Sequence, residues 1–444
     1  MRDLVVPSVH VSTKPGQLQT AEQPGGSALS GQAALNAGYD TREQVCFAGP
    51  NSGGSCAAPP TGATAYTYDA ANEITGMGSS TLSYNSANEL CWTLSSGSSN
   101  GCATPPTGAT TYGYDTRGNR VSVVPSSGAA TCDAYDQADR LITVTSGTGA
   151  SCTGPTTVGN YTYNSDGLRM SKTVGSTTTK FAWNLTGSLP ALLQERVSGG
   201  SVTDYVYGPE GTPLEQISGS TVLLYHADQL GSTRVLTDTS GTIQATYGYD
   251  AYGNVTSSTG SVVNPFLFAG QYLDAESGLY YLQARYYDPA TAQFLTRDPF
   301  DATTREAYEY GLDNPLTFTD PTGQVFTTDG GGDYSLGATQ LLLDPCAGKP
   351  AGTPGCTSPV NALLNRLDAG VNNAGQGFSA GVAVFGTGGC LAASLVGCTA
   401  GSAFGGWGGL IGGFIDGFCT DTKRQLPSPW DAWSDVPGNV HESQ

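Results

Sequence analysis

Basic residues and histidines are scarce in this chain of 444 residues. Lysine and arginine together number 18 against 37 acidic residues, which sets the formal net charge at −19. A surface of this charge repels phosphate, so we expect no nucleic-acid partner. The three histidines are His10, His226 and His441, and no two cysteines have the C-x-x-C spacing. We therefore expect no metal site and no cofactor.

The start of the sequence shows no pattern of a cleaved leader. Residues 1–20 hold no apolar run long enough for the core of a signal peptide. This indicates either a chain that begins inside a longer gene or export without a cleaved leader. Eleven cysteines are many for a reducing compartment, and they favour a secreted or cell-surface location.

An internal repeat dominates the first two thirds of the chain. "CAAPPTGATAYTYDAANEITGM" begins at Cys56 and "CATPPTGATTYGYDTRGNRVSV" begins at Cys102. A looser copy starts at Cys152, and copies without a cysteine occupy 135–145 and 247–258. The shared unit is Y-x-Y-D-x-x-G/N followed by an alternating strand. The repeat predicts one supersecondary unit that is copied along the chain.

Each residue type in the unit has a structural reason. In Y-x-Y both rings lie on one face of a strand, because side chains alternate with period two. Asp opens a turn, since its carboxylate bonds the backbone that follows. Asn72, Gly118, Gly167 and Gly253 are expected to adopt the positive φ of the turn. Each unit is thus a hairpin, and stacked units predict a mainly β fold with one continuous curled sheet.

Every repeat cysteine follows a second cysteine, which predicts three disulfides between successive strands or their loops. Such short closed loops contribute about 2–3 kcal/mol each. The alternative is that these cysteines are free, buried thiols. A fourth pair would close a small loop in the C-terminal part of the chain. The predicted pairs are Cys46–Cys56, Cys91–Cys102, Cys132–Cys152 and Cys346–Cys356.

The Y-x-Y-D-x-x-G-N pattern resembles the YD repeats of rearrangement-hotspot (RHS) proteins, Tc toxin C components and teneurins. Residues 225–323 resemble the RHS-associated core domain, with "YHADQLGSTRVLTDTSG", "FAGQYLDAESGLYYLQARYYDPATAQFLTRDP" and "NPLTFTDPTG". The resemblance covers about residues 60–323. It implies a hollow β shell that encloses a C-terminal polymorphic toxin.

The resemblance also implies two motifs at the end of the core, each of the form D-P-x-G. The second motif is 320–323, and Asp298 begins the first motif at the spacing that the family has. Two residues depart from the pattern. Asp301 stands where the first motif has Gly, and Gln324 stands where Leu usually follows the second motif.

In relatives the two motif aspartates resemble an aspartyl-protease pair that cuts just after the second motif. Two nearby carboxylates cannot both ionise cheaply, so one activates water while the other keeps a proton. The predicted catalytic residues here are Asp298, Asp320 and Arg297, with self-cleavage after Gln324. The alternative is that each Asp-Pro only caps a turn. The string "RYYDP" from Arg285 is interpreted as packing and turn.

The tail, residues 324–444, shares no repeat with the preceding sequence. Residues 359–373 have apolar positions at helical spacing, and 377–415 form a run of 39 residues without a charge, rich in Gly and Ala. Two interpretations remain open. The run contacts a membrane, or it is a partly helical hairpin that packs within the shell. An enzymatic tail is poorly supported, because His441 is its one histidine and no nucleotide or zinc motif occurs.

The predicted organisation has four parts: an N-terminal extension (1–45), a YD-repeat sheet (46–224), an RHS-associated core (225–323) and a variable tail (324–444). The predicted function is an RHS-type polymorphic toxin, or the C-terminal fragment of one, that encloses and cleaves its own tail. Its expected partners are that tail, an immunity protein and a membrane at 377–415. The alternative is a cell-surface structural or adhesive protein that binds carbohydrate or protein and uses the tail as an anchor.

Overall fold

The computed structural model describes residues 20–21, 35–96, 101–186, 189–208, 211–299, 301, 307–324 and 326. The chain divides into two compact units, Met1–Gln376 and Gly377–Gln444, and every described residue belongs to the first. Most of the N-terminal extension, and the tail apart from Gln324 and Phe326, lie outside the described residues. The predictions for the Cys346–Cys356 pair, the helix at 359–373 and the uncharged run at 377–415 lie there as well.

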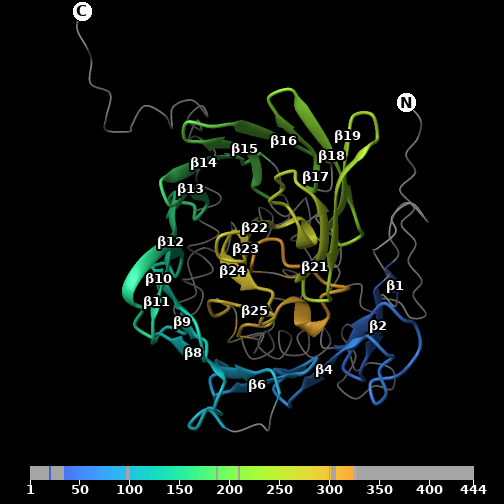
Figure 1. The fold of residues 1–444 in the computed structure, drawn as a ribbon, viewed down its shortest axis with the longest axis vertical. Coiled ribbons are helices and arrows are strands. Elements are labelled where there is room, and N and C mark those ends of the chain that lie inside the picture. The colour runs from blue at the N-terminus through green and yellow to red at the C-terminus, as the bar shows by residue number, and fades with distance from the viewer. Residues whose placement is uncertain are drawn as a thin grey trace, which may run out of the picture. The chain divides into compact units, whose positions relative to one another are not determined.

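Within the described part of the chain, 21 strands form one sheet in which each strand pairs antiparallel with the next. The sheet is a meander that curves around a smaller sheet (Figure 1). The first ten strands are β1 (Thr20–Ala21), β2 (Leu35–Tyr39), β3 (Val45–Gly49), β4 (Thr64–Tyr68), β5 (Ile74–Met77), β6 (Ser80–Tyr84), β7 (Leu90–Leu94), β8 (Thr110–Tyr114), β9 (Arg120–Val124) and β10 (Ala130–Tyr135). The remaining strands are β11 (Leu141–Thr148), β12 (Thr153–Tyr163), β13 (Arg169–Val174), β14 (Thr177–Asn184), β15 (Ala191–Val197), β16 (Val202–Tyr207), β17 (Pro213–Ser218), β18 (Thr221–Ala227), β19 (Thr233–Asp238), β20 (Ile243–Tyr249) and β21 (Val255–Gly260).

The turns of the repeat follow one hydrogen-bond scheme. In the turn after β10, Asp136 Oδ1 accepts the backbone N–H groups of Ala138 (2.8 Å) and Arg140 (3.1 Å). An aspartate or asparagine does the same in the turns that begin at residues 40, 69, 85, 115, 164, 228 and 250. The predicted positive φ is confirmed at Asn72 (73°), Gly118 (82°), Gly167 (84°) and Gly253 (90°). The hairpin prediction is therefore confirmed in its local chemistry.

A tyrosine at the end of one strand ties each unit to the unit before it. Tyr135, the last residue of β10, donates its hydroxyl proton to the carbonyl of Arg120, the first residue of β9 (2.8 Å). Tyr163 makes the same bond to Leu141 at 2.6 Å. The same pairing recurs as Tyr68 to Val45, Tyr84 to Ile74 and Tyr249 to Thr233. The strand-end tyrosine, which is the second tyrosine of Y-x-Y at Tyr68, Tyr163 and Tyr249, therefore satisfies a backbone carbonyl while its ring packs against the core.

Residues 272–294, within the core predicted at 225–323, form a second sheet of four strands. The first sheet surrounds it in Figure 1. Aromatic side chains fill its centre: Tyr287 and Tyr310 have ring centroids 4.4 Å apart, and Phe294 packs against both. Rings at these separations stabilise the core beyond their buried area alone. The elements are β22 (Tyr272–Asp274), β23 (Leu279–Leu282), β24 (Arg285–Asp288), β25 (Gln293–Phe294) and the short 3₁₀ segments η2 (Phe268–Gly270) and η3 (Gly311–Asp313).

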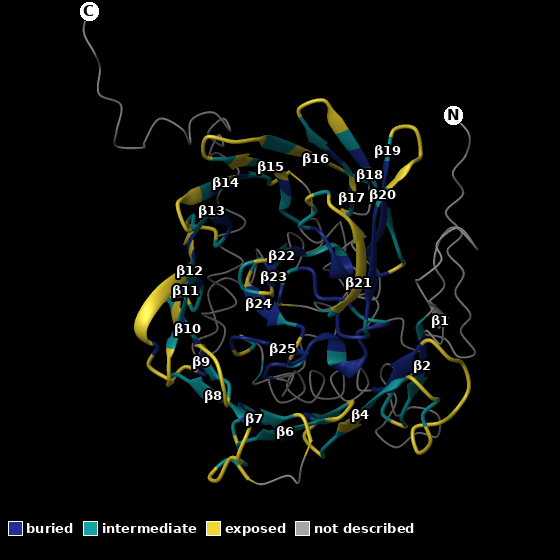
Figure 2. Cartoon of the chain, in the orientation of Figure 1, coloured by how far each residue is buried: buried dark blue, intermediate teal, exposed yellow. Residues whose placement is uncertain are grey.

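Buried polar contacts join the two sheets. Arg169 of β13 forms an ion pair with Asp274 of β22, and Arg120 of β9 bonds Asp288 at 2.7 Å. Tyr308 donates to the carbonyl of Gly118 at 2.7 Å. Figure 2 shows buried residues along the inner sheet and exposed residues on the outer loops. The fold is therefore the mainly β, curled meander that the repeat predicted.

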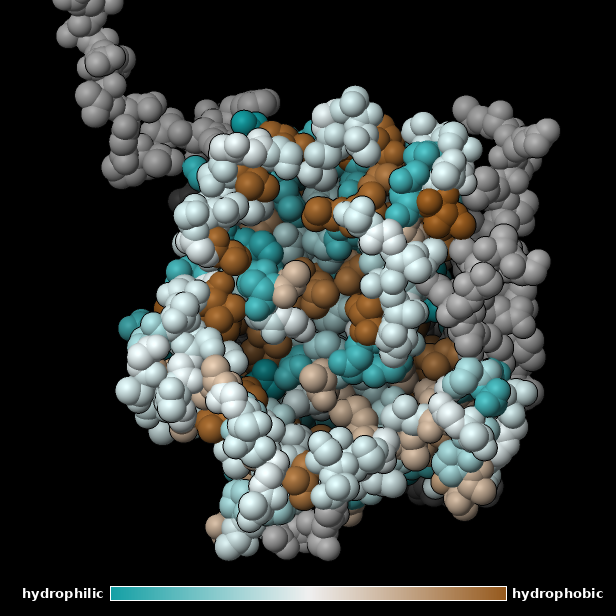
Figure 3. Space-filling model, in the orientation of Figure 1, coloured by the Kyte–Doolittle hydropathy of each residue, from teal (hydrophilic) through white to brown (hydrophobic). Residues whose placement is uncertain are grey.

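Three of the predicted disulfides are present: Cys46–Cys56, Cys91–Cys102 and Cys132–Cys152. Each joins a strand of the meander to a neighbouring loop or strand end, which agrees with the repeat-linked spacing. No helix within the described residues is long and apolar enough to cross a membrane. On the face in Figure 3, hydrophobic residues appear in the hollowed middle and singly on the rim.

Candidate active site

The two motif aspartates meet at one arginine. Arg285 Nη2 lies 3.1 Å from Asp298 Oδ2 and 3.3 Å from Asp320 Oδ2. All three side chains are buried or nearly so, with exposed fractions of 5%, 12% and 4%. A cation between two carboxylates offsets their mutual repulsion in a poorly solvated site. The structure thus brings together the two residues that the motif spacing singled out, and it adds a third.

Arg285 is held in place by its neighbours. It begins β24, and its guanidinium lies over the Phe294 ring at 3.7 Å from the centroid. Asp298 follows β25 and donates its backbone N–H to the carbonyl of Ala307 (2.8 Å). A planar guanidinium on an aromatic face loses little freedom when it binds two carboxylates. Packing of the small sheet therefore orients the arginine.

The second motif forms a turn that docks on the β23–β24 hairpin. Asp320 Oδ1 accepts the N–H of Gln324 (3.0 Å), and Ala284 donates its N–H to the carbonyl of Thr322 (3.0 Å). Arg285 Nε donates to the carbonyl of Gly323. Gly323 has φ 68°, and a Cβ there would lie 2.7 Å from a backbone oxygen of the hairpin. Only glycine fits this approach without strain.

Arg297 lies elsewhere, although its sequence position suggested a role beside Asp298. Its Nε bonds Asp301 Oδ2 in an i,i+4 ion pair, with Arg297 44% and Asp301 22% exposed. Asp301 is the residue that departs from the first motif. Its carboxylate is paired with Arg297. Arg285, which the sequence analysis interpreted as packing and turn, is the arginine that contacts both aspartates.

A second pair of carboxyl groups was missed entirely. Glu73 lies between β4 and β5, and Glu309 lies in the core predicted at 225–323. Gln293 donates a hydrogen bond to Glu73 Oε2 (3.3 Å). Burial, and then mutual repulsion with Glu309, raise the pKa of Glu73 far above its ordinary value. Burial raises the pKa of Glu309 to about 7. The Oε1 atoms of both residues are buried without a hydrogen-bond partner among the described residues. The two positions share no motif, so the sequence held no signal for the pair.

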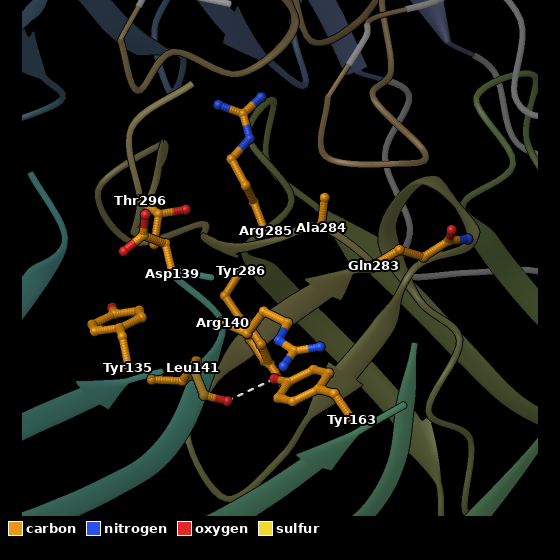
Figure 4. Close-up of a pocket in the computed structure, with 10 residues that line it drawn as sticks. All are labelled: Tyr135, Asp139, Arg140, Leu141, Tyr163, Gln283, Ala284, Arg285, Tyr286 and Thr296. Atoms are coloured by element: carbon orange, nitrogen blue, oxygen red, sulfur yellow. Dashed lines mark hydrogen bonds between the residues drawn. The ribbon is translucent and has the colours of Figure 1, made fainter. Parts of the chain in front are cut away.

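A small cavity lies beneath the site, between β10–β12 and the hairpin at 282–285. Its volume is about 10 Å³, enough for about one water molecule and too small for a substrate. In Figure 4 the Arg285 side chain points away from Tyr135, Leu141 and Tyr163. No group of three or more metal-ligating side chains occurs in the described part of the chain.

Comparisons with known proteins agree with this architecture. Residues 197–315 match the family model of the teneurin YD-shell. The chain is 36% identical over 172 residues to the tRNA3(Ser)-specific nuclease WapA of Bacillus spizizenii, a match covering 37% of this chain and 7% of that protein. It is 31% identical over 142 residues to the toxin protein Tse5 of Pseudomonas aeruginosa, covering 31% and 10%. The chain therefore spans less than a tenth of the first relative's length.

A solved structure of TcdB2-TccC3-TEV is also similar, at 17% identity and a TM-score of 0.39. The match covers 69% of this chain and 18% of that chain.

Proposed function

From the premise that this chain is a YD-repeat protein of the RHS type, we propose that it is part of a polymorphic toxin that cleaves itself once at the motif 320–323. The observation that carries the proposal is the contact of Arg285 with both Asp298 and Asp320. These three groups lie where the repeat-rich sequence gives way to a tail of different composition. Such a site acts on its own chain and needs no pocket for a separate substrate.

The roles of the three groups follow from their surroundings. Asp298, the more exposed of the two acids, takes a proton from the attacking water. Asp320, the more buried acid, donates a proton to the departing nitrogen. Arg285, which contacts both acids, stabilises the negative charge that develops on the reacting carbonyl oxygen. The pair therefore works with one proton between two carboxyl groups.

The curved sheet is the proposed container, and residues after the second motif are its cargo. The inner side of the wall carries tyrosines such as Tyr161, Tyr205 and Tyr225, each buried. The relatives named above are a nuclease and a toxin, which favours cargo with toxic activity over the adhesive alternative. We propose the uncharged run at 377–415 as the part that contacts a membrane, and an immunity protein as the partner that neutralises the tail.

An extracytoplasmic destination is part of the proposal. Three disulfides support it, because such bonds persist in oxidising compartments. The toxin relatives support the same location.

Mass spectrometry of the purified chain tests self-cleavage. We expect two fragments that remain associated, in place of one species of 45.5 kDa. Asp298→Asn and Asp320→Asn each keep the size of the side chain while removing the titratable group, so each variant should give one intact chain. A single full-length species from the unmodified protein would falsify the proposed activity. If the asparagine variants still cleave, the aspartates are turn residues.

A further inference from the structure

We propose that the start of the large sheet, residues 35–94, is a pH-sensitive flap that stays closed on the core at 225–323 while the carboxyl pair of Glu73 and Glu309 keeps a proton. The proposal goes beyond self-cleavage and does not depend on it. The flap holds strands β2–β7, at the blue end of the meander in Figure 1. Glu73 belongs to the flap and Glu309 to the core, so their contact lies where the two parts meet.

Two of the four carboxyl oxygens of this pair accept N–H groups. Glu73 Oε2 accepts the side chain of Gln293 (3.3 Å), and Glu309 Oε2 accepts the backbone N–H of Tyr308 (2.9 Å). The two Oε1 atoms are buried without a hydrogen-bond partner among the described residues, and Glu73 is only 1% exposed. Two ionised carboxylates in this place would lack both water and donors. The closed form therefore favours a protonated carboxyl group.

Acids outnumber cations around the pair. Among the described residues, the ionisable groups that act on it are Asp69, Asp313, the phenol of Tyr84 and the guanidinium of Arg285. Arg285 lowers the pKa of Glu309, but the same guanidinium already contacts both motif aspartates. It is therefore shared among several acids, and it offsets only part of the repulsion at the contact between flap and core.

The flap is attached to the rest of the large sheet by a short ladder. β7 pairs with β8 at Trp92 and Thr93, whereas the ladder between β10 and β11 extends over the whole of Ala130–Tyr135. The buried apolar side chains of the flap form a cluster separate from the main aromatic core. A part of the chain with short ladders and its own apolar cluster can open at a lower free energy than global unfolding.

Other contacts across the same boundary are insensitive to pH near neutrality. The hydroxyl groups of Tyr68 and Tyr252 are hydrogen-bonded at 2.9 Å, and the Tyr66 ring lies 5.2 Å from the Tyr252 ring. Burial raises the pKa of Tyr68 and of Tyr252 well above the usual tyrosine value, so both stay neutral. These contacts hold the flap at every pH, and the carboxyl pair adds the part that changes.

Raising the pH should open the flap. Burial raises the pKa of Glu309 from 4.5 to about 7, and burial also raises the pKa of Glu73. The closed form therefore binds more protons than an open form in which both acids reach water. The contribution of Glu309 to closure is complete below about pH 4.5 and is lost as pH rises through about 7. For Glu309 alone, the opening equilibrium should rise about 10-fold between pH 6 and pH 8, and Glu73 acts in the same direction.

Hydrogen exchange of the full chain, followed by mass spectrometry of its peptides, tests the flap. Labelling times at pH 6 and pH 8 are scaled for the chemical exchange rate. We expect peptides from 35–94 to lose protection about 10-fold or more at pH 8, while peptides from β18–β20 keep theirs. Equal protection of 35–94 at both pH values overturns the proposal. An equal loss in both sets of peptides also overturns it, because the whole molecule would then be opening.

Substitutions supply a matched comparison. Glu73→Gln combined with Glu309→Gln keeps the shape of both side chains and removes their titration, so protection of 35–94 should be the same at both pH values. Glu89→Gln is the control, because Glu89 has the same position in the next turn, where Asn85 donates to it (2.7 Å). This control should keep the full pH effect.

A pH effect that survives in the double variant, or that disappears in Glu89→Gln, contradicts the proposal. Thermal unfolding at pH 6 shows whether each variant is folded. If the double variant does not fold, the comparison of the two sets of peptides in the unmodified chain still decides.

Discussion

Arg285 and Arg297 are both close to Asp298 in the sequence, yet their surroundings differ. Arg285 is buried on the Phe294 ring and contacts both aspartates, whereas Arg297 is 44% exposed and pairs with Asp301. An exposed i,i+4 pair contributes only about 0.3–0.5 kcal/mol, so it has little influence on structure. The buried Arg285 guanidinium, in contrast, offsets the repulsion between Asp298 and Asp320 and fixes the positions of both side chains.

Substitution of the two arginines separates their roles. Arg285→Gln should slow self-cleavage by about 100-fold or more, because the carbonyl and the acid pair lose their cation. Arg297→Gln should cleave at the rate of the unmodified chain. Densitometry of the fragments over time gives both rates, and thermal unfolding identifies loss through misfolding. Equal losses in the two variants would contradict the assignment.

Glu309 makes stability depend on pH. Burial raises the pKa of Glu309 from 4.5 to about 7. The charged neighbours of Glu309 are Glu73 and Arg285, and Glu73 in turn interacts with Asp313 and Asp69. The folded state therefore binds more protons than the unfolded state between about pH 4.5 and 7. The contribution of Glu309 to the free energy of unfolding is fully present below that range and is lost as pH rises through it. At about 1.4 kcal/mol per pKa unit, the free energy of unfolding falls by on the order of 3 kcal/mol across this range.

Glu309→Gln should flatten this pH dependence. The amide stays neutral at every pH and can donate to Glu73, so its contribution does not change between pH 5 and pH 8. Urea unfolding at both pH values measures the difference between the two proteins. Groups that do not interact with Glu309 cancel on subtraction, so the difference reports the pair of Glu73 and Glu309. A slope identical in both proteins would exclude Glu309 as its source.

At the scale of elements, the hairpin unit is held by two local devices. The Asx turn satisfies backbone N–H groups at its tip, as Asp136 does. The strand-end tyrosine satisfies a carbonyl of the preceding unit, as Tyr135 does at Arg120. Together they connect neighbours in the meander independently of which side chains fill the interior.

Tyr135→Phe tests the second device. Removing the hydroxyl leaves the Arg120 carbonyl without this donor and should lower the free energy of unfolding by about 1 kcal/mol. Tyr66→Phe is the matched control, because the Tyr66 hydroxyl is buried without a hydrogen-bond partner in the described part of the chain. That control should be unchanged or slightly more stable in urea unfolding. Equal destabilisation of both variants would argue that ring packing alone matters.

For the whole molecule, stability depends on buried ties between the large sheet and the small one. Arg169 of β13 is fully buried, bonds Asp274 of β22 and lies 4.4 Å from the centroid of the Tyr281 ring. Lys172 reaches the same Asp274 at 3.0 Å but is partly exposed. These contacts link residues far apart in the chain, so the two sheets should unfold together.

Arg169→Met should lower the free energy of unfolding by about 3–5 kcal/mol, because a buried carboxylate loses its main partner. Lys172→Met should lower it by about 1 kcal/mol or less, since that ammonium is closer to solvent. Denaturant unfolding followed by tyrosine and tryptophan fluorescence should show one transition in each case. Two separate transitions in the unmodified protein would mean that the sheets are independent.

The elements of this fold were predictable because their determinants are local. Asn72 and Gly253 sit in turns whose conformation depends on residues within one hairpin, and Cys132 and Cys152 close a loop of neighbouring strands. The repeat shows these local rules many times over. The pairing of Asp298 with Asp320 was also readable, through a motif that the family resemblance supplied.

By itself, then, the sequence determined the hairpin repeat, its turns and the three disulfides of the repeat. The acid pair came from the family resemblance. Only the tertiary structure decided that Arg285 joins the acids, and that Glu73 lies close enough to Glu309 to affect its pKa. Those contacts arise where the large sheet closes on the small one, between residues with no common spacing. A side chain's partner there depends on burial and on the path of the whole chain, and neither is written in any short stretch of sequence.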